Sequence, residues 1–108
     1  METMSTYILA IDAGTTGITV HCFGKQAIPE QQFYSEFPQY FPKPAWVEQD
    51  PEEIWETTKR LVSQAIDACG GPENIAAIGI ANQRETTVVW ERDSSRPVHR
   101  AIVWQCRR

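Results

Sequence analysis

The chain has 108 residues, a net charge of −4 at pH 7 and an apolar content of 42%. This length and apolar content suffice for the core of one ordinary domain and leave no room for two full lobes. The acidic balance argues against a nucleic-acid partner, because proteins that bind a phosphate backbone carry a basic stripe. Arg100, Arg107 and Arg108 are therefore expected to be solvated charge.

The cysteines and the apolar runs indicate a compartment. Cys22, Cys69 and Cys106 form no Cys-x-x-Cys pair and have no histidine at ligand spacing, so neither a disulfide framework nor a zinc site is predicted. The first apolar run ends at Asp12, with Glu2 where a secretory leader would carry positive charge, and no run is long enough to span a bilayer. We expect a cytoplasmic protein without a membrane partner.

The first part of the chain predicts a meander of three strands. Residues 7–11 form an apolar run typical of a buried strand, and residues 18–23 form a second one. The tight turn at residues 12–17 joins them. Alternating apolar and polar residues predict a third strand within residues 27–41, up to Pro38.

The turn itself carries groups that suit a phosphate. Gly14 and Gly17 let the backbone approach a ligand, while exposed N–H groups and the Thr15 and Thr16 hydroxyls can donate to phosphate oxygens. Asp12 would then face the phosphates across a hydrated Mg²⁺. No Gly-Lys-Ser/Thr follows, so this is not the lysine-bearing phosphate loop. As a pattern alone, it also fits a plain hairpin turn with polar residues.

A helix is predicted to begin after Asp50. This residue can cap the helix, Pro51 occupies the first helical position, and Glu53 is placed to complete a capping box. The glycines and proline at residues 70–72 end the run, and Trp55 is expected in the core. One apolar face follows at steps of three and four: Ile54, Thr58, Leu61, Val62, Ala65, Ile66 and Cys69.

Polar residues follow the next predicted strand. Residues 75–80 are typical of a strand buried on both faces, and residues 82–85 come at its carboxyl end, where ligands of open α/β sheets bind. Arg84 offers only donors and Glu85 only acceptors, so together they can bind neighbouring hydroxyls of a small polyol. The alternative is a surface ion pair, worth at most about 1 kcal/mol.

Two more strands are predicted at residues 86–90 and 101–104, with a turn at residues 91–97 between them. The second of these strands would carry Trp104 at its end. The chain stops within residues 105–108, directly after a predicted buried strand, so we expect a partial domain.

Five sequence segments carry a family resemblance: residues 12–16, 42–48, 50–55, 78–87 and 101–108. In this order and at this spacing they make the chain resemble the N-terminal part of the glycerol kinases, within the FGGY family of carbohydrate kinases. The resemblance implies an α/β fold, part of the first lobe of an actin-like ATPase (ribonuclease H-like) fold. It would contain a mixed sheet with antiparallel hairpin strands and at least one packed helix. Residues 1–108 would be a partial N-terminal domain, without the second lobe.

The resemblance also implies a substrate, cofactors and site residues. The substrate would be glycerol or a related small polyol, the cofactors ATP and Mg²⁺, and the parent enzyme a homo-oligomer. Arg84 and Glu85 match the glycerol-binding pair, and Trp104 matches the aromatic residue that packs on the carbon face of the substrate. The phosphate-binding residues would be Asp12, Gly14, Thr15, Thr16 and Gly17, with Asp12 also the metal ligand.

Three positions depart from the glycerol kinase pattern: Ala13 replaces a glutamine, Gly17 a serine and Thr19 an arginine. The missing arginine weakens a nucleotide contact, whereas the glycerol side is unchanged. The family's general base is an aspartate further downstream, so residues 1–108 alone are expected to be inactive. The predicted function of the whole enzyme is ATP-dependent phosphorylation of glycerol to sn-glycerol 3-phosphate. A kinase for a pentulose or another polyol, and a non-catalytic actin-like nucleotide-binding module, are the alternatives.

Overall fold

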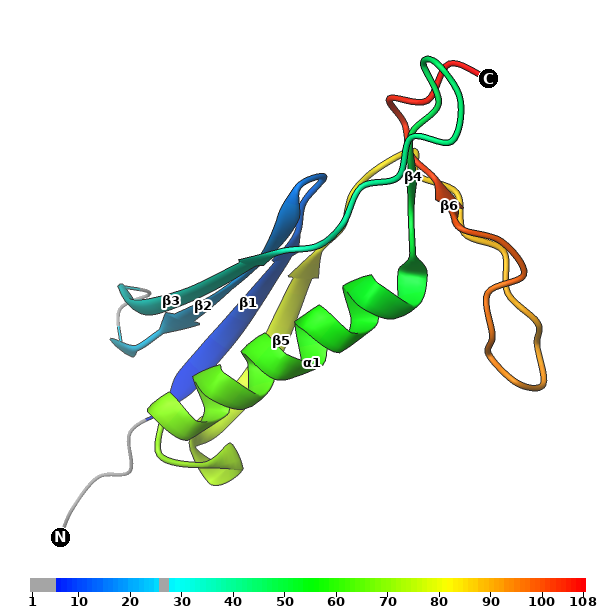
Figure 1. Ribbon diagram of the computed structural model, residues 1–108. Coiled ribbons are helices and arrows are strands. Elements are labelled where there is room, and N and C mark those ends of the chain that lie inside the picture. Colours follow the sequence, from blue (N-terminus) through cyan, green and yellow to red (C-terminus); the bar gives the residue numbers. More distant parts are fainter. Residues whose placement is uncertain (1–5, 26–27) are drawn as a thin grey trace, which may run out of the picture.

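A four-stranded mixed sheet crossed by one long helix forms the body of the computed structural model, which describes residues 6–25 and 28–108 (Figure 1). The strands are β1 (Tyr7–Ala13), β2 (Gly17–Phe23), β3 (Pro29–Glu36) and β5 (Ile75–Ala81), in the spatial order β3-β2-β1-β5. A second sheet pairs β4 (Glu48–Gln49) with β6 (Ala101–Ile102). The helix is α1 (Pro51–Ala68), and a short 3-10 helix, η2 (Pro72–Asn74), leads into β5.

The predicted meander is confirmed. β1 and β2 pair in antiparallel fashion, β3 continues antiparallel to β2, and the Gly14 N–H donates to the Gly17 carbonyl at 3.0 Å to close the first turn. Gly17 also allows β3 to pack closely, because a Cβ there would lie 2.6 Å from the Ser35 carbonyl oxygen of β3. One of the three departures from the family pattern is thus explained by the close approach of β3.

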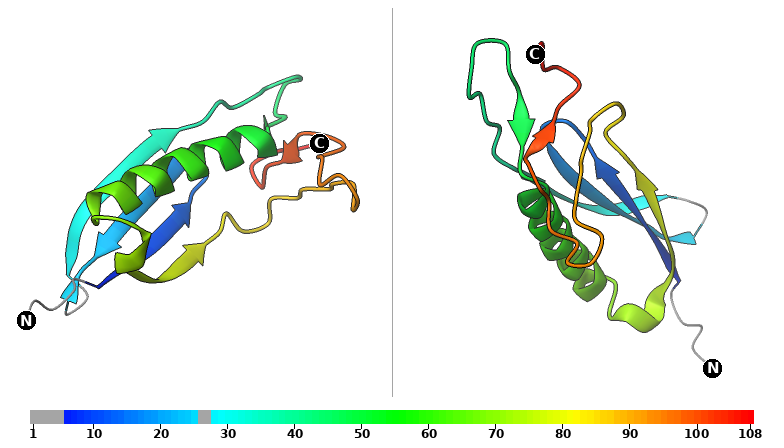
Figure 2. Two further views of the ribbon diagram at one scale, coloured as in Figure 1. Left: turned by 90° about the horizontal axis from the view of Figure 1, so that it is seen from below. Right: turned by 90° about the vertical axis from the view of Figure 1, so that its right-hand side faces the viewer.

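The core lies between the helix and the sheet. α1 covers one face of the sheet over β2 and β3 (Figure 2). Burying each large apolar side chain there contributes about 1.5–3 kcal/mol. The buried residues are Leu9, Ile11, Ile18, Val20 and Cys22 from the sheet, Phe37 beyond β3, and Leu61, Ala65 and Cys69 from the helix and its end.

The start of the helix is confirmed, although its capping box is not. The Asp50 carboxylate accepts from the Glu52 N–H at 2.9 Å, and Pro51 opens the helix. Glu53 instead accepts a hydrogen bond of 2.6 Å from the Tyr40 hydroxyl, which anchors the preceding connector to the helix. Within the described part of the chain, no helix combines the length and apolar character needed to cross a membrane.

Two burial predictions were wrong. Trp55 is 58% exposed, because the buried stripe of α1 runs through Thr57, Leu61 and Ala65, and Trp55 lies on another side of the helix. β5 was expected to be buried on both faces, yet Ile80 is 73% exposed. β5 is an edge strand of this sheet and α1 lies over the strands at the opposite edge.

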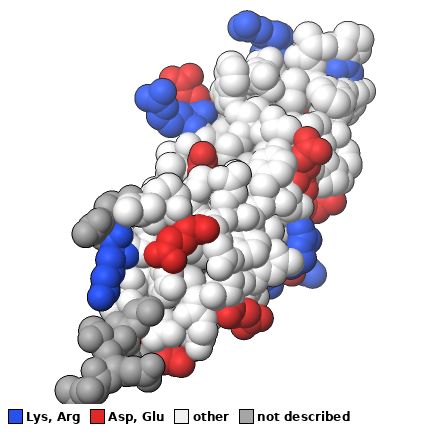
Figure 3. Space-filling view, turned by 90° about the vertical axis from the view of Figure 1, so that its left-hand side faces the viewer, with Lys and Arg blue, Asp and Glu red and all other residues white. Residues whose placement is uncertain are grey.

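One face of the molecule, shown in Figure 3, is mostly uncharged, with scattered acidic and basic groups.

The last two predicted strands are mostly absent. Residues 86–90 contribute only isolated bridges, Thr87 to Ile102 and Trp90 to Pro97, and β6 covers only two of the four residues expected in the final strand. Both segments run as an irregular ribbon beside β4, with the end of the chain next to the loop that precedes β4 (Figure 1). The Val103 and Arg107 N–H groups donate to carbonyls of that loop at 3.1 and 2.8 Å.

A buried carboxylate holds this end of the chain. Glu48 is only 4% exposed, and Arg108 donates to it at 2.6 Å while Arg100 lies 3.7 Å away. Arg108 also lies over the Trp46 ring, and Arg100 over the Tyr40 ring, each at 3.8 Å from the ring centre. Arg100 stays exposed, in line with the prediction of solvated charge, whereas the Arg108 side chain is only 23% exposed because it packs against Glu48 and Trp46. The hydrogen bond from Arg108 lowers the pKa of Glu48, against the opposing effect of burial.

This pKa shift predicts a pH-dependent contribution to stability. Because the pKa of Glu48 lies below its usual value of 4.5, its charge stabilises the folded state above pH 4.5, and this effect disappears as the pH falls through the lowered value. In the full-length gene product, Glu48→Gln should lower the free energy of unfolding at pH 7 by about 1–3 kcal/mol. Melting curves of the variant and the wild type should converge at more acidic pH. The exposed Glu91→Gln is the control, and a pH-independent difference for Glu48→Gln would contradict the assignment.

Candidate functional site

Parallel pairing of β1 and β5 places two polar segments at one edge of the sheet. Asp12 of β1 pairs with Ala81 of β5, so the turn after β1 and residues 82–85 after β5 begin side by side. Figure 1 shows the β1–β2 turn and the arrowhead of β5 at the same end of the sheet. The two segments that carry the candidate site residues therefore start from neighbouring strand ends.

A hollow of about 420 Å³ lies between the two segments. The structure brings Arg84, Glu85 and Trp104 together with the turn at residues 12–17, the candidate phosphate turn. Its lining consists of Gly14, Thr15, Asn82, Gln83, Arg84, Glu85 and Trp104.

Three other predicted site residues do not line the hollow. Asp12 is exposed at the end of β1, and Thr16 is exposed on the turn. Gly17 is buried at the start of β2, where its lack of a side chain lets the Ser35 carbonyl approach closely. Any ligand contact made by these residues would therefore involve a part of the ligand that lies outside the hollow.

Arg84 and Glu85 are both exposed and point their functional groups from a tight turn. The salt bridges found in residues 6–25 and 28–108 include neither of them, so the alternative of a surface ion pair is not what the structure has. Glu85 has a φ of 60°, a left-handed conformation that costs a non-glycine residue about 1–3 kcal/mol. Such strain concentrates at functional sites, and here it leaves a donor and an acceptor group free side by side.

Trp104 lines the same hollow as this pair. It lies just beyond β6, is 51% exposed, and its indole N–H donates to the Thr15 hydroxyl oxygen at 3.0 Å. The indole thus offers an open aromatic face while its polar edge binds the phosphate turn. The sequence predicted the aromatic face, but it gave no sign of the bond to Thr15.

Sequence reasoning missed a group of glutamines behind the hollow. Gln49 of β4 is completely buried, and its amide N–H donates to the Thr15 carbonyl at 2.7 Å and to the Gln39 amide oxygen at 2.8 Å. Gln39 donates to the same Thr15 carbonyl at 3.1 Å. Buried glutamine has a high cost unless its amide is fully hydrogen-bonded. The signal available in the sequence was weak, since Gln49 lies among charged residues and follows no pattern.

A metal site at Asp12 fits the chemistry of Mg²⁺. Within the described residues there is no cluster of three or more His, Cys, Asp or Glu side chains able to enclose a metal ion. Mg²⁺ does not need such a cluster, because it keeps several waters and takes one or two carboxylates together with phosphate oxygens. A single exposed carboxylate beside a phosphate turn therefore fits this ion.

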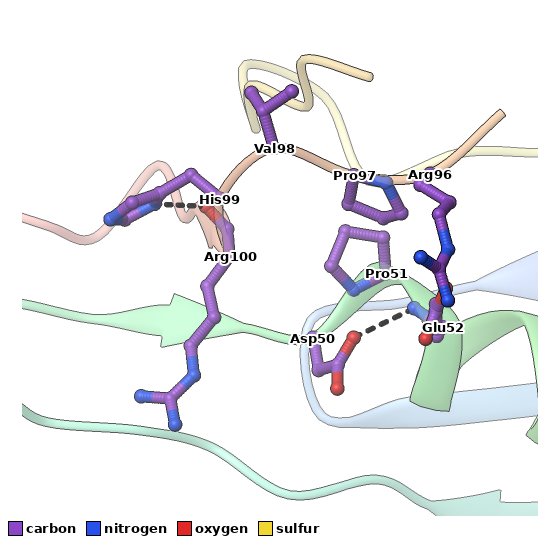
Figure 4. Close-up of a pocket in the computed structure, with 8 residues that line it drawn as sticks. All are labelled: Asp50, Pro51, Glu52, Arg96, Pro97, Val98, His99 and Arg100. Atoms are coloured by element: carbon purple, nitrogen blue, oxygen red, sulfur yellow. Dashed lines mark hydrogen bonds between the residues drawn. The ribbon is translucent and has the colours of Figure 1, made fainter. Parts of the chain in front are cut away.

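A second hollow, of about 370 Å³, lies at the start of α1 and outside the predicted site. Figure 4 shows that Asp50 turns to the Glu52 N–H and that Arg100 extends away from the paired Pro51 and Pro97 rings. The guanidinium of Arg100 is engaged by Tyr40 and Glu48. The groups around this hollow therefore serve the fold, and they do not converge on a ligand.

The mixed sheet with its covering helix and the paired ends of β1 and β5 are of the sugar-kinase type, and comparison with known proteins gives the family. The model of the FGGY family of carbohydrate kinases, N-terminal domain, matches residues 7–108. The chain belongs to this family. The predicted actin-like fold of the first lobe is confirmed by its solved neighbours.

Curated relatives of this chain include glycerol kinases. The chain is 54% identical over 103 residues to glycerol kinase of Leptospira biflexa and 56% identical over 107 residues to that of Sinorhizobium fredii. These matches cover 94% and 97% of this chain and 21% of each relative. The chain therefore spans about a fifth of the length of the relatives it matches.

Solved structures of several sugar kinases share this fold. The crystal structure of Plasmodium falciparum glycerol kinase with ADP matches with a TM-score of 0.87 at 30% identity, over 96% of this chain and 21% of that one. Gluconate kinase from Lactobacillus acidophilus matches with a TM-score of 0.86 at 20% identity, over 94% of this chain and 20% of that one. The second likeness shows the fold alone.

Proposed function

We propose that the protein is an ATP-dependent glycerol kinase, which produces sn-glycerol 3-phosphate, and that residues 1–108 are a partial N-terminal domain that supplies the acceptor site and part of the phosphate site. The observation that carries this proposal is the hollow shared by the phosphate turn, the Arg84–Glu85 pair and Trp104. The identity of more than half to curated glycerol kinases supports glycerol over other acceptors.

In this proposal, the acceptor is bound by complementary groups. Arg84 donates to one hydroxyl and Glu85 accepts from its neighbour, which orients a vicinal diol in one direction. The exposed face of Trp104 covers the carbon chain of the substrate, an apolar surface that would otherwise face water. Three carbons and three hydroxyls are recognised by one aromatic face and two polar groups.

The phosphate side uses the turn between β1 and β2. Thr15 accepts from the Trp104 indole, which leaves its own hydroxyl hydrogen free to donate to a phosphate oxygen. Thr16 adds a second hydroxyl on the exposed side of the turn, and Gly14 and Gly17 shape its backbone. Asp12 would hold Mg²⁺, which when bound neutralises phosphate charge during transfer.

Phosphoryl transfer also needs a base for the attacking hydroxyl. Among the described residues, Glu85 is the one carboxylate that lines the hollow, and it is assigned to acceptor binding. The base and most of the nucleotide site are therefore assigned to parts of the protein beyond these residues. Residues 1–108 alone are expected to produce no turnover.

A substrate panel tests the proposal. ADP release by the full-length gene product should be measured with ATP and Mg²⁺, with glycerol beside several pentuloses and other polyols. Glycerol-selective turnover is expected. If only another substrate is phosphorylated, that substrate would be the acceptor in place of glycerol. Xylulose and gluconate kinases share this fold, so the panel includes this outcome. No turnover with any substrate would favour a non-catalytic nucleotide-binding module.

Replacing the acceptor-binding arginine should act on substrate affinity. Arg84→Ala is expected to raise the KM for glycerol about tenfold or more, because it removes charge-assisted hydrogen bonds worth about 1.5–3 kcal/mol. Steady-state kinetics at saturating ATP give this value. Arg92→Ala, an exposed arginine outside the hollow, is the matched control. A KM for glycerol that stays at the wild-type value would remove the role assigned to Arg84.

Replacing the metal carboxylate should act on rate and metal requirement. Asp12→Asn keeps the shape and removes the charge, so we expect kcat to fall about tenfold or more and the Mg²⁺ concentration for half-maximal rate to rise. The KM for glycerol should change little, since Asp12 does not line the hollow. The exposed Asp67→Asn on α1 serves as the control. An unchanged rate with an unchanged Mg²⁺ requirement would refute the assignment.

A further inference from the structure

The two segments that carry the candidate site residues are joined by a closed circuit of hydrogen bonds. Gln49 donates to the Thr15 carbonyl at 2.7 Å, and its amide oxygen accepts from Gln83 at 3.0 Å. Gln83 in turn accepts from the Thr86 hydroxyl at 2.8 Å, and Thr86 accepts from the Trp104 backbone N–H at 3.4 Å. The Trp104 indole then donates back to the Thr15 hydroxyl at 3.0 Å. The circuit begins and ends on the residue proposed to contact the phosphate.

The buried corner of this circuit uses both the donors and the acceptor of a glutamine amide. The two amide hydrogens of Gln49 are donated to the Thr15 carbonyl and to the Gln39 amide oxygen. Its own amide oxygen accepts a hydrogen bond from the Gln83 amide. A glutamate at this position would have no hydrogens to donate, and a methionine of similar size would make none of the three bonds. Because the side chain is completely buried, water cannot replace the lost partners.

The members of the circuit come from four separate stretches of chain. Thr15 lies on the turn after β1, Gln49 on β4, Gln83 and Thr86 after β5, and Trp104 after β6. The pairing of β1 with β5 ends at Asp12 and Ala81, so it does not itself join the two loops that follow these strands. The circuit fixes these loops to each other, at the place where acceptor and phosphate would have to meet.

We propose that Gln49 is a positioning residue, which holds the phosphate turn and the acceptor-binding segment at a fixed separation through this circuit. The inference rests on the proposed kinase function. Gln49 is not among the residues that line the hollow, so it acts through its hydrogen bonds to Thr15, Gln39 and Gln83. Its loss should misalign the acceptor hydroxyl and the transferred phosphoryl group while the contacts that bind each of them remain.

The test is a comparison of kcat and KM in the full-length gene product. Gln49→Met should lower kcat roughly ten- to a hundredfold, the effect of a small misplacement of reacting groups, while the KM values for glycerol and ATP stay within about threefold. Gln64→Met, an exposed glutamine on α1, is the matched control and should behave as wild type. Melting curves of the same samples verify that the variants are folded.

A second variant tests the circuit from its other side. Thr86→Val removes the bonds to Gln83 and Trp104 at a site that is only partly buried, so folding is not at risk. Members of one circuit act as a unit, so the double variant with Gln49→Met should be no slower than the slower single variant. Effects on kcat that multiply, a change confined to KM, or a wild-type rate for Gln49→Met would each overturn the role of Gln49. A wild-type protein that phosphorylates no substrate would overturn the proposed function and this role together.

Discussion

Parallel pairing between β1 and β5 is the constraint on which the candidate site depends. β1 also pairs in antiparallel fashion with β2, so its carboxyl end leads into a tight turn, while β5 reaches the same edge by a route through the whole of α1. A parallel neighbour requires such a crossover connection. The helix that supplies it packs on the sheet, and its burial therefore stabilises the register that sets Asp12 beside Ala81.

The small second sheet places the third component of the site. β4 lies directly before α1, and its pairing with β6 brings residues 101–102 beside the start of the helix. Two residues later the chain reaches Trp104. Glu48 and Gln49, neighbours on β4, thus have different tasks: Glu48 holds the end of the chain through Arg108, and Gln49 contacts the phosphate turn. Two short strands are sufficient to hold the end of the chain in place, because these buried polar contacts add to the backbone hydrogen bonds between the strands.

Local signals in the sequence predicted the helix and most of the strands, and the wrong predictions concern features that depend on contacts between residues far apart in the chain. The hairpin, the capped start of α1 and the segment after β5 follow from turn residues, capping and apolar periodicity, which act over a few positions. The exposure of Trp55 and of β5 depends on which elements lie opposite them, and periodicity does not contain that information. The glutamine contacts behind the hollow were also invisible, because Gln39, Gln49 and Gln83 are far apart in the sequence. Arg84 and Glu85 were selected by their hydrogen-bonding chemistry and their place after a predicted strand, whereas the role of Trp104 came from the family resemblance.

The three departures from the family pattern all lie on the β1–β2 hairpin, and two of them have structural consequences. Gly17 is compatible with the close approach of β3, where a larger residue would collide with the Ser35 carbonyl. Thr19 lies directly across from Asp12 in the pairing of β1 with β2, so an arginine there would face this carboxylate on the neighbouring strand. With threonine instead, no cation of β2 competes for the negative charge of Asp12. The hairpin of this chain therefore differs in how it would meet metal and phosphate, whereas the acceptor side keeps every residue of the pattern.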